Sequence, residues 1–234
     1  MLILAIDTAL DACAGAILDT ASTEVIAREA ISMKRGHAEA LMPLLARVMQ
    51  QSGLAFSELD RIAVTTGPGS FTGLRVGLSA ARGLALAAQK PVVGLTTLAA
   101  YAAPIVARND PQPVLAAIDA RHDHVYFQLV TGDGHPLVSP RVAPIDEAVQ
   151  ATGSHPAPHL VGNAARLLAA RWPADHPAPA SVDMQSAPDI AWVAWLGAAV
   201  SPDSAPAKPY YLRAPDAKPQ MGAAPPQASS SPFP

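Results

Sequence analysis

The sequence predicts an α/β fold of two related units, in which mixed sheets are flanked by helices. Short apolar runs of strand length alternate with longer segments of helical periodicity. An apolar run ending in aspartate, a polar turn and a second apolar run occur at 2–18 and again, 112 residues later, at 114–130. Half of the 234 residues are hydrophobic and 15% are charged, which is ample for a core and excludes overall disorder.

The first unit is expected to span 1–103 and to begin with a hairpin, because the turn-forming stretch Asp7–Ala12 separates two apolar runs. A helix follows, since leucine, valine and methionine form two adjoining apolar stripes between His37 and Gln51. Pro43 should either start this helix or kink it. The expected strands are Leu2–Ile6, Cys13–Leu18, Glu24–Met33, Arg61–Thr66 and Pro91–Leu95, and the expected helices are His37–Gln51, Phe71–Ala88 and Thr96–Ala107.

The turn from Gly67 to Gly73 contains three glycines in seven residues, which marks backbone that bends sharply or lies close to something. It could hold a phosphate at the start of the next helix, although it lacks the lysine of a P-loop. The plainer interpretation is a tight strand-to-helix turn capped by Ser70 or Thr72. The helix itself carries only Arg75 and Arg82 as charges, so most of its surface should be covered.

The second, smaller unit is expected to span 104–213, and the tail at 214–234 to be disordered, because it is rich in proline, alanine and serine without periodicity. Alternating or continuous apolar patterns define the elements of this unit. Its expected strands are Val114–Asp119, His124–Val130 and Pro158–Gly162, and its expected helices are Asn163–Arg171 and Pro188–Val200.

Charge and cysteine content restrict the classes of function. A net charge of −3 does not resemble the basic surface of a protein that binds nucleic acid on its own. The single cysteine, Cys13, fits a reducing cytoplasm and more closely resembles a core residue than a nucleophile. The amino terminus lacks a basic leader, and no apolar segment is long enough for a membrane span, so we expect neither a signal peptide nor a membrane partner.

Five segments occur in an order that resembles the bacterial TsaB family. They are AIDTALDACAGAIL, RGHAEALMPLL, TTGPGSFTGLRVGL, AAIDARHDHVYFQL and KPYYLR, and together they cover roughly 1–213. The resemblance implies two ribonuclease-H-like lobes of the actin-like ATPase superfamily. It also implies a cytoplasmic, non-catalytic subunit of the complex that makes threonylcarbamoyladenosine in tRNA. Its implied partners are the catalytic paralogue TsaD, the ATPase TsaE, a second copy of itself when alone, and tRNA only through the complex.

The resemblance implies no catalytic residue and no metal in this chain. The catalytic paralogue carries a metal-binding HxxxH motif, whereas here His37 is followed by Leu41, and a single imidazole cannot chelate an ion. His122 and His124 have a metal-like spacing but lie in a turn without identifiable further ligands.

No nucleotide cofactor of its own is expected, although ATP or ADP could bind where the subunits meet. In actin-like ATPases a nucleotide approaches the position of Asp7 and Thr8, and the glycine turn could add Gly67, Gly69 and Ser70. The alternative interpretation of these residues is therefore an actin-like ATPase or small-molecule kinase. A metallopeptidase is a third alternative, which the absent second histidine argues against.

The two long helices of the first unit are the expected partner surface. Gly73, Gly77 and Ala81 recur at a spacing of four, so small residues line one helix face and allow another helix to approach. In the resembled family the two helices form a bundle with the matching pair of the paralogue. The expected interface residues are Leu41, Leu45, Val48, Met49, Gly73, Leu74, Gly77, Leu78 and Ala81.

Overall fold

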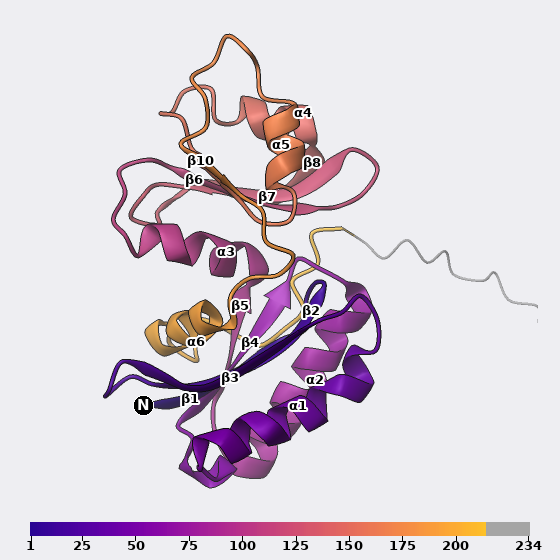
Figure 1. The fold of residues 1–234 in the computed structure, drawn as a ribbon, viewed down its shortest axis with the longest axis vertical. Helices are drawn as coiled ribbons and strands as arrows, with labels where there is room; N and C mark the ends of the chain where they lie inside the picture. The colour runs from indigo at the N-terminus through magenta and orange to yellow at the C-terminus, as the bar shows by residue number, and fades with distance from the viewer. Residues whose placement is uncertain (214–234) are drawn as a thin grey trace, which may run out of the picture.

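The structure, a computed structural model, describes residues 1–213 and contains two five-stranded mixed sheets in separate lobes (Figure 1). The tail expected at 214–234 lies outside the described residues. Within 1–213, every helix is too short or too polar to cross a membrane. The two lobes and their flanking helices confirm the predicted fold class.

The first sheet has the strand order β3-β2-β1-β4-β5. Its first three strands, β1 (Leu2–Asp7), β2 (Ala12–Asp19) and β3 (Glu24–Ser32), form an antiparallel meander. Strands β4 (Arg61–Gly67) and β5 (Val92–Thr96) extend the sheet in the direction of β1. The carboxyl ends of three parallel strands therefore lie at the same edge, which is where ligands bind in sheets of this kind.

The second sheet repeats this topology with the order β10-β9-β6-β7-β8. Strands β6 (Val114–Asp119), β7 (His124–Val130) and β8 (Pro136–Pro144) are antiparallel, whereas β9 (His159–Val161) and β10 (Ser181–Asp183) run parallel to β6. The duplication predicted from the repeated strand–aspartate–turn–strand pattern is therefore present in the fold.

Helices form three layers around the sheets (Figure 1). Helices α1 (His37–Ser52) and α2 (Phe71–Ala88) cover one face of the first sheet, and α6 (Ile190–Ala199) covers the other. Helix α3 (Thr97–Val106) lies between the sheets, while α4 (Ile145–Gln150) and α5 (Ala165–Ala170) pack on the second sheet. A short 3-10 turn, η1 (Phe56–Glu58), precedes β4. Pro43 lies inside α1, beyond its first turn.

Helix α6 corrects the expected division of the chain at residue 103. Although it comes late in the sequence, its Ile190 and Val193 pack with Ile3 and Ala63 of the first sheet. The chain then continues along β5, where the Gly94 amide donates to the carbonyl oxygen of Ala205 at 2.9 Å. The physical reason is that β1 and β4 are buried along both faces, so the first sheet needs a helix on each side.

Four elements were absent from the sequence prediction, one of them the 3-10 turn η1. Strand β8 contains Pro136, Pro140 and Pro144, but it is an edge strand, where a missing amide donor is tolerated. Helix α4 has six residues and β10 has three, so both are too short for a periodic pattern to be recognised.

Candidate functional site

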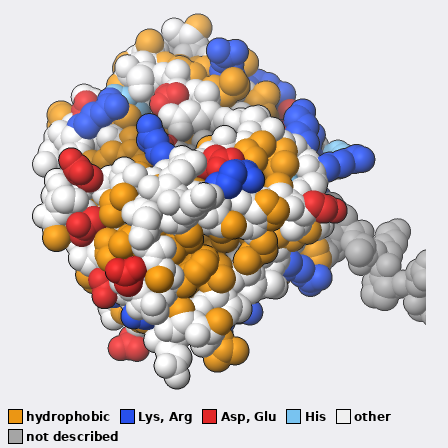
Figure 2. Space-filling view, turned by 60° about the horizontal axis from the view of Figure 1, so that its bottom comes forward, with side chains coloured by type: hydrophobic (Ala, Val, Ile, Leu, Met, Phe, Trp, Pro, Cys, Tyr) orange, Lys and Arg blue, Asp and Glu red, His pale blue; other side chains and the backbone are white. Residues whose placement is uncertain are grey.

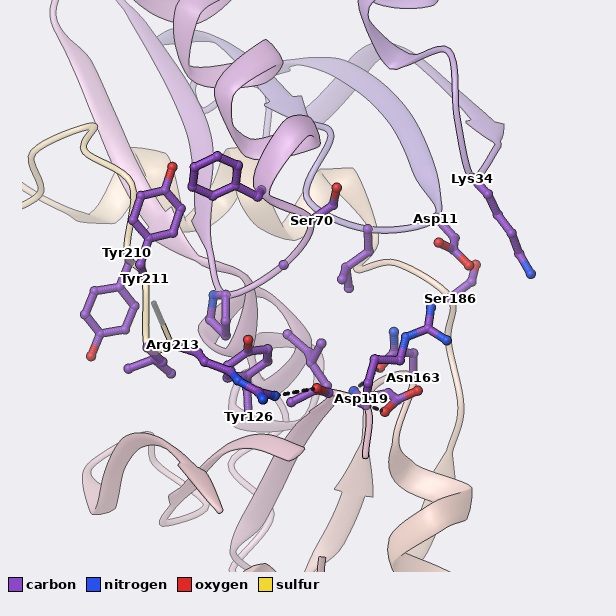
Figure 3. Close-up of a pocket in the computed structure, with 18 of the residues that line it drawn as sticks. Asp11, Lys34, Ser70, Asp119, Tyr126, Asn163, Ser186, Tyr210, Tyr211 and Arg213 are labelled. Atoms are coloured by element: carbon purple, nitrogen blue, oxygen red, sulfur yellow. Dashed lines mark hydrogen bonds between the residues drawn. The ribbon is translucent and has the colours of Figure 1, made fainter. Parts of the chain in front are cut away.

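A cavity of about 570 Å³ opens between the lobes, at the carboxyl ends of β1, β4 and β6 (Figure 3). The first lobe contributes the β1–β2 turn, Lys34 and the start of α2, and the second contributes the β6–β7 turn. The late segment 210–213 closes one side. The polar and charged lining residues are Asp11, Lys34, Ser70, Asp119, Arg121, Tyr126, Asn163, Ser186, Tyr210, Tyr211 and Arg213.

The glycine turn is held by the chain's own backbone. The Ser70 amide donates to the carbonyl oxygen of Ala9 at 2.7 Å, and the Ser70 hydroxyl accepts from the Gly73 amide at 3.3 Å. A Cβ on Gly69 would lie 2.3 Å from that Ala9 oxygen, so a side chain there would collide with the β1–β2 turn. The plainer interpretation is thus supported, because Ser70 caps α2 and the turn packs tightly on the neighbouring hairpin.

Asp7 and Thr8 lie beneath this contact and do not line the cavity. Asp7 is fully buried, and its Oδ1 accepts from the Thr65 hydroxyl at 2.5 Å and from the Ala9 amide at 3.0 Å. Its Oδ2 has no hydrogen-bond partner. Burial raises the pKa of the Asp7 carboxyl, and the bond from Thr65 opposes this only in part.

The five residues named for the alternative of a bound nucleotide do not come together in the cavity. Only Gly69 and Ser70 line it, whereas Asp7, Thr8 and Gly67 are buried. The Thr8 hydroxyl donates to the carbonyl oxygen of Gly73 at 2.7 Å, so it stabilises the start of α2. The side chains of Asp7 and Thr8 are therefore both hydrogen-bonded within the protein itself.

The β6–β7 turn, which lines the cavity from the second lobe, has an unusual backbone conformation. Arg121, His122 and Asp123 all have left-handed φ angles, of 65°, 51° and 61°. The Asp119 carboxylate accepts from the Arg121 amide at 2.8 Å, and the Asp119 amide donates to Asn163. Three consecutive left-handed residues other than glycine are costly, and such strain is concentrated at functional sites.

The sequence analysis did not place the segment 210–213 at the site. The Tyr210 amide donates to the carbonyl oxygen of Thr66 at 2.8 Å, and the Tyr211 ring packs 5.1 Å from the Phe71 ring. The Arg75 guanidinium lies 3.8 Å from the centre of the Phe71 ring on α2. The sequence shows two tyrosines near a late arginine, but nothing local indicates that they return to the glycine turn.

All nine residues expected at a partner interface are buried, and of these only Leu41 also lines the groove on the outer face of the two helices. A Cβ on Gly77 would lie 2.4 Å from Oγ1 of Thr8, so the stripe of small residues packs on the β1–β2 turn. The small residues of α2 therefore pack against the protein's own β1–β2 hairpin. The prediction that they face a partner helix is wrong.

The outer face of α1 and α2 instead carries a groove of about 720 Å³. Figure 2, turned so that these helices come forward, shows hydrophobic side chains gathered on this face and charged ones mostly around them. Arg75 is the one charged side chain of the groove among the described residues. We call this the outer groove, and its lining residues are Ala38, Leu41, Met42, Phe71, Thr72, Arg75, Val76, Ser79 and Ala80.

His37 and Cys13 are buried, and His124 bonds within its own turn. His37 is buried and its Nε2 lies 3.0 Å from the carbonyl oxygen of Leu10, while His124 contacts the carbonyl oxygen of His122. In the described part of the chain, no three His, Cys, Asp or Glu side chains are grouped as a metal site. Burial raises the pKa of the Cys13 thiol to about 11, so the thiol stays protonated at neutral pH.

A cluster of polar side chains that was not predicted lies in the second lobe. Nδ1 of His159 lies 2.8 Å from the Ser181 hydroxyl, and its Nε2 lies 3.3 Å from a carboxylate oxygen of Asp110. The cluster joins β9 to β10 and to the loop before β6. We infer that these contacts stabilise the pairing of the two short strands.

Family and sequence comparisons match this chain to one group. Residues 24–156 match the family model described as TsaD: tRNA N6-adenosine threonylcarbamoyltransferase. The chain is 39% identical over 131 residues to the tRNA threonylcarbamoyladenosine biosynthesis protein TsaB of Escherichia coli, which covers 54% of each protein. The protein of the same description in Haemophilus influenzae is 38% identical over 128 residues. The chain spans about half the length of these curated relatives.

Longer matches cover almost the whole chain. An uncharacterized protein of Mycobacterium tuberculosis is 31% identical over 220 residues, 93% of this chain and 94% of that protein. The solved structure of YeaZ from Pseudomonas aeruginosa has a TM-score of 0.72 at 28% identity and covers 90% of this chain and 99% of its own. A second structure, described as similar to peptidase YEAZ from Pseudomonas aeruginosa, has a TM-score of 0.76 at 29% identity, with 91% and 99% covered.

Proposed function

Since the chain belongs to the TsaB family, we propose that it acts in the synthesis of tRNA N6-threonylcarbamoyladenosine as a non-catalytic subunit. Its partner is the catalytic paralogue TsaD. The complex transfers a threonylcarbamoyl group from threonylcarbamoyl-adenylate to N6 of the adenosine next to the anticodon. This chain stabilises TsaD and completes a joint surface, and the ATPase TsaE is the third member.

The outer groove is the observation that carries this proposal. Met42 is 48% exposed although it is a large apolar side chain, and Val76 and Ala80 lie across the groove from α1. An apolar groove between two helices is suited to the apolar face of a partner helix. Because the inner faces of α1 and α2 are already buried on the sheet, the outer face is the one available to a partner.

The surface shared with TsaD has two other occupants, a second copy of this chain and a nucleotide. When TsaD is absent, a second copy of this chain covers the same groove. ATP or ADP binds between the subunits and not to this chain alone, since Asp7 and Thr8 are buried beneath the glycine turn.

The test is a single charge in the groove. We expect Met42→Lys to fold normally, because Met42 is half exposed, and to lose at least roughly a hundredfold in affinity for TsaD, because docking would bury an unpaired charge. Lysine is chosen because Arg75, on the same groove, cannot neutralise it. Affinity is measured by calorimetry, and tRNA modification by the reconstituted complex is measured in parallel.

Leu167→Lys is the matched control. Leu167 is 41% exposed on α5 of the other lobe, so the same charge is added to a similar apolar position outside the groove. TsaD should bind this variant as it binds the unchanged chain. Equal affinity of the two variants for TsaD would refute the groove as the docking surface.

The rival function is an actin-like ATPase or small-molecule kinase. It requires Mg-ATP between the lobes of the isolated chain, and calorimetry without partners distinguishes the two functions. Binding in the micromolar range would favour the rival, and heat signals no larger than those of buffer are expected.

A further inference from the structure

The rim of the interlobe cavity combines exposed aromatic rings with unpaired cations. We propose that this rim contacts a single-stranded segment of RNA, with a base stacked on Tyr211 and phosphates near Arg121 and Lys34. The inference rests on the proposed function, in which the complex acts on tRNA, and assigns to this chain a direct contact with the substrate. We call Phe71, Tyr210 and Tyr211, together with Arg121 and Lys34, the cleft rim. Arg75 lies against Phe71 and lines the outer groove.

The aromatic part of the cleft rim forms a stack. The Arg75 guanidinium lies 3.8 Å from the centre of the Phe71 ring, whose other neighbour is the Tyr211 ring at 5.1 Å and an interplanar angle of 32°. Tyr210 and Tyr211 are 37% and 41% exposed, and within 1–213 no Phe or Trp and no other Tyr is as exposed. Base stacking on such a ring tolerates any sequence, because every base has a π-face.

The tyrosines are held in place before any ligand binds. The Tyr210 amide donates to Thr66, and Nε of Arg82 donates to the carbonyl oxygen of Ala207 at 3.0 Å. Pro206 also pairs with Val93 at the edge of the first sheet. A segment anchored at three points loses little entropy when a base stacks on it.

The cations of the cleft rim are available for phosphates. Among the described residues, the side chains of Lys34 and Arg121 make no hydrogen bond or ion pair, whereas Arg47 and Arg171 are paired with carboxylates elsewhere on the surface. Arg121 is also the first residue of the strained left-handed turn. Strain held at a turn that presents an unpaired cation to a cavity favours a binding role.

Other features favour a single strand over a duplex. Bases in a duplex are covered on both faces, so Tyr210 and Tyr211 could not stack on them. The cavity behind the rim is about 570 Å³, which is within the size range of small-molecule sites, and its Asp119 and Asn163 can bond the edge of a base. With a net charge of −3 on the whole chain, the contact should be weak alone and strengthened by the complex.

The test measures binding of the full chain, without partners, to a fluorescent anticodon stem–loop RNA at about 50 and 200 mM salt. The unchanged chain should bind at the lower salt and lose affinity at the higher. Tyr211→Ala should weaken binding roughly five- to a hundredfold, and Tyr211→Phe should retain it. Arg121→Gln should weaken binding and reduce the slope of log affinity against log salt by about 0.7.

Arg166→Gln is the control, because Arg166 is an exposed cation on α5 that does not line the cavity. Circular dichroism verifies that Tyr211→Ala is folded, and the exposed Arg121→Gln gives an independent test if it is not. Absence of binding at the lower salt, or equal binding by Arg121→Gln and Arg166→Gln, overturns the proposal. Equal affinity for a blunt RNA duplex, or for free AMP, also overturns it. TsaD is absent from this assay, so its failure leaves the Met42→Lys test of the proposed function unaffected.

Discussion

Gly73→Ala is expected to destabilise the protein by about 3 kcal/mol or more, one of the largest effects available from adding a methyl group. The added Cβ would lie 2.1 Å from the carbonyl oxygen of Thr8, which is backbone and cannot rotate away. Relief requires α2 to separate from the β1–β2 turn, which breaks the hydrogen bond from Thr8 to Gly73. Thermal unfolding should show a midpoint lower by roughly 6–12 °C.

Gly83→Ala in the same helix gives the matched comparison. Nothing lies within 4 Å of a Cβ at residue 83, and the position is exposed. Alanine should therefore stabilise α2 by about 0.5–1 kcal/mol, because it restricts the unfolded chain and favours the helix. The two glycines should shift the midpoint in opposite directions. A small effect at both would show that the β1–β2 turn does not pack tightly on α2.

The sequence predicted the regular elements of the fold well where local patterns are strong. Helix α2 begins and ends at the expected Phe71 and Ala88, and β6 and β7 have the expected bounds. Both hairpins and their aspartates were recognised because polarity changes sharply at the turns. The duplication was detectable for the same reason, since the pattern recurs in the same order.

The sequence could not show which surface covers each apolar face. The stripe containing Gly73 and Gly77 has the spacing of a helix contact, but what packs on it is a turn about 65 residues earlier in the chain. Helix α6 is apolar on all sides, so its periodicity did not indicate which face is buried. It covers the first sheet although it lies near the other end of the described chain. Such choices depend on tertiary packing, which local patterns do not contain.

The candidate site was predictable only in part. Gly69 and Ser70, which the sequence named only for the alternative of a bound nucleotide, line the cavity, and whether they contact a nucleotide stays a prediction. Asp7, named for the same alternative, is buried beneath the turn that follows it and accepts from the Ala9 amide of that turn. Tyr210 and Tyr211 were missed, since no local pattern specifies where a carboxy-terminal segment returns.

Asp7→Asn is the second large effect, and it should stabilise the protein at neutral pH by about 1–2 kcal/mol, or roughly 2–8 °C. Asp7 is fully buried, and its Oδ2 has no partner. Asparagine retains an oxygen that can accept from Thr65 and from the Ala9 amide, and it removes the buried charge. Its NH2 group takes the place of the partnerless Oδ2, so the expected gain is the relief of the charge less the cost of that unpaired donor group. Asp7→Ala should not reproduce the gain, because both donors would lose their acceptor.

The pH dependence of the stability difference between Asp7→Asn and the unchanged chain tests this account of Asp7. Burial raises the folded-state pKa of Asp7 above its unfolded value of about 3.9, so its contribution to stability is fully present below that pH and is lost as pH rises through the folded-state pKa. The advantage of Asp7→Asn should therefore be small near pH 4 and grow toward pH 8. A variant less stable than the unchanged chain at pH 8 would contradict this account. Because the proposed function uses Asp7 only to shape the hairpin, a folded Asp7→Asn chain should also support tRNA modification at the unchanged rate. Loss of modification despite higher stability would instead point to chemistry at Asp7, as the rival ATPase requires.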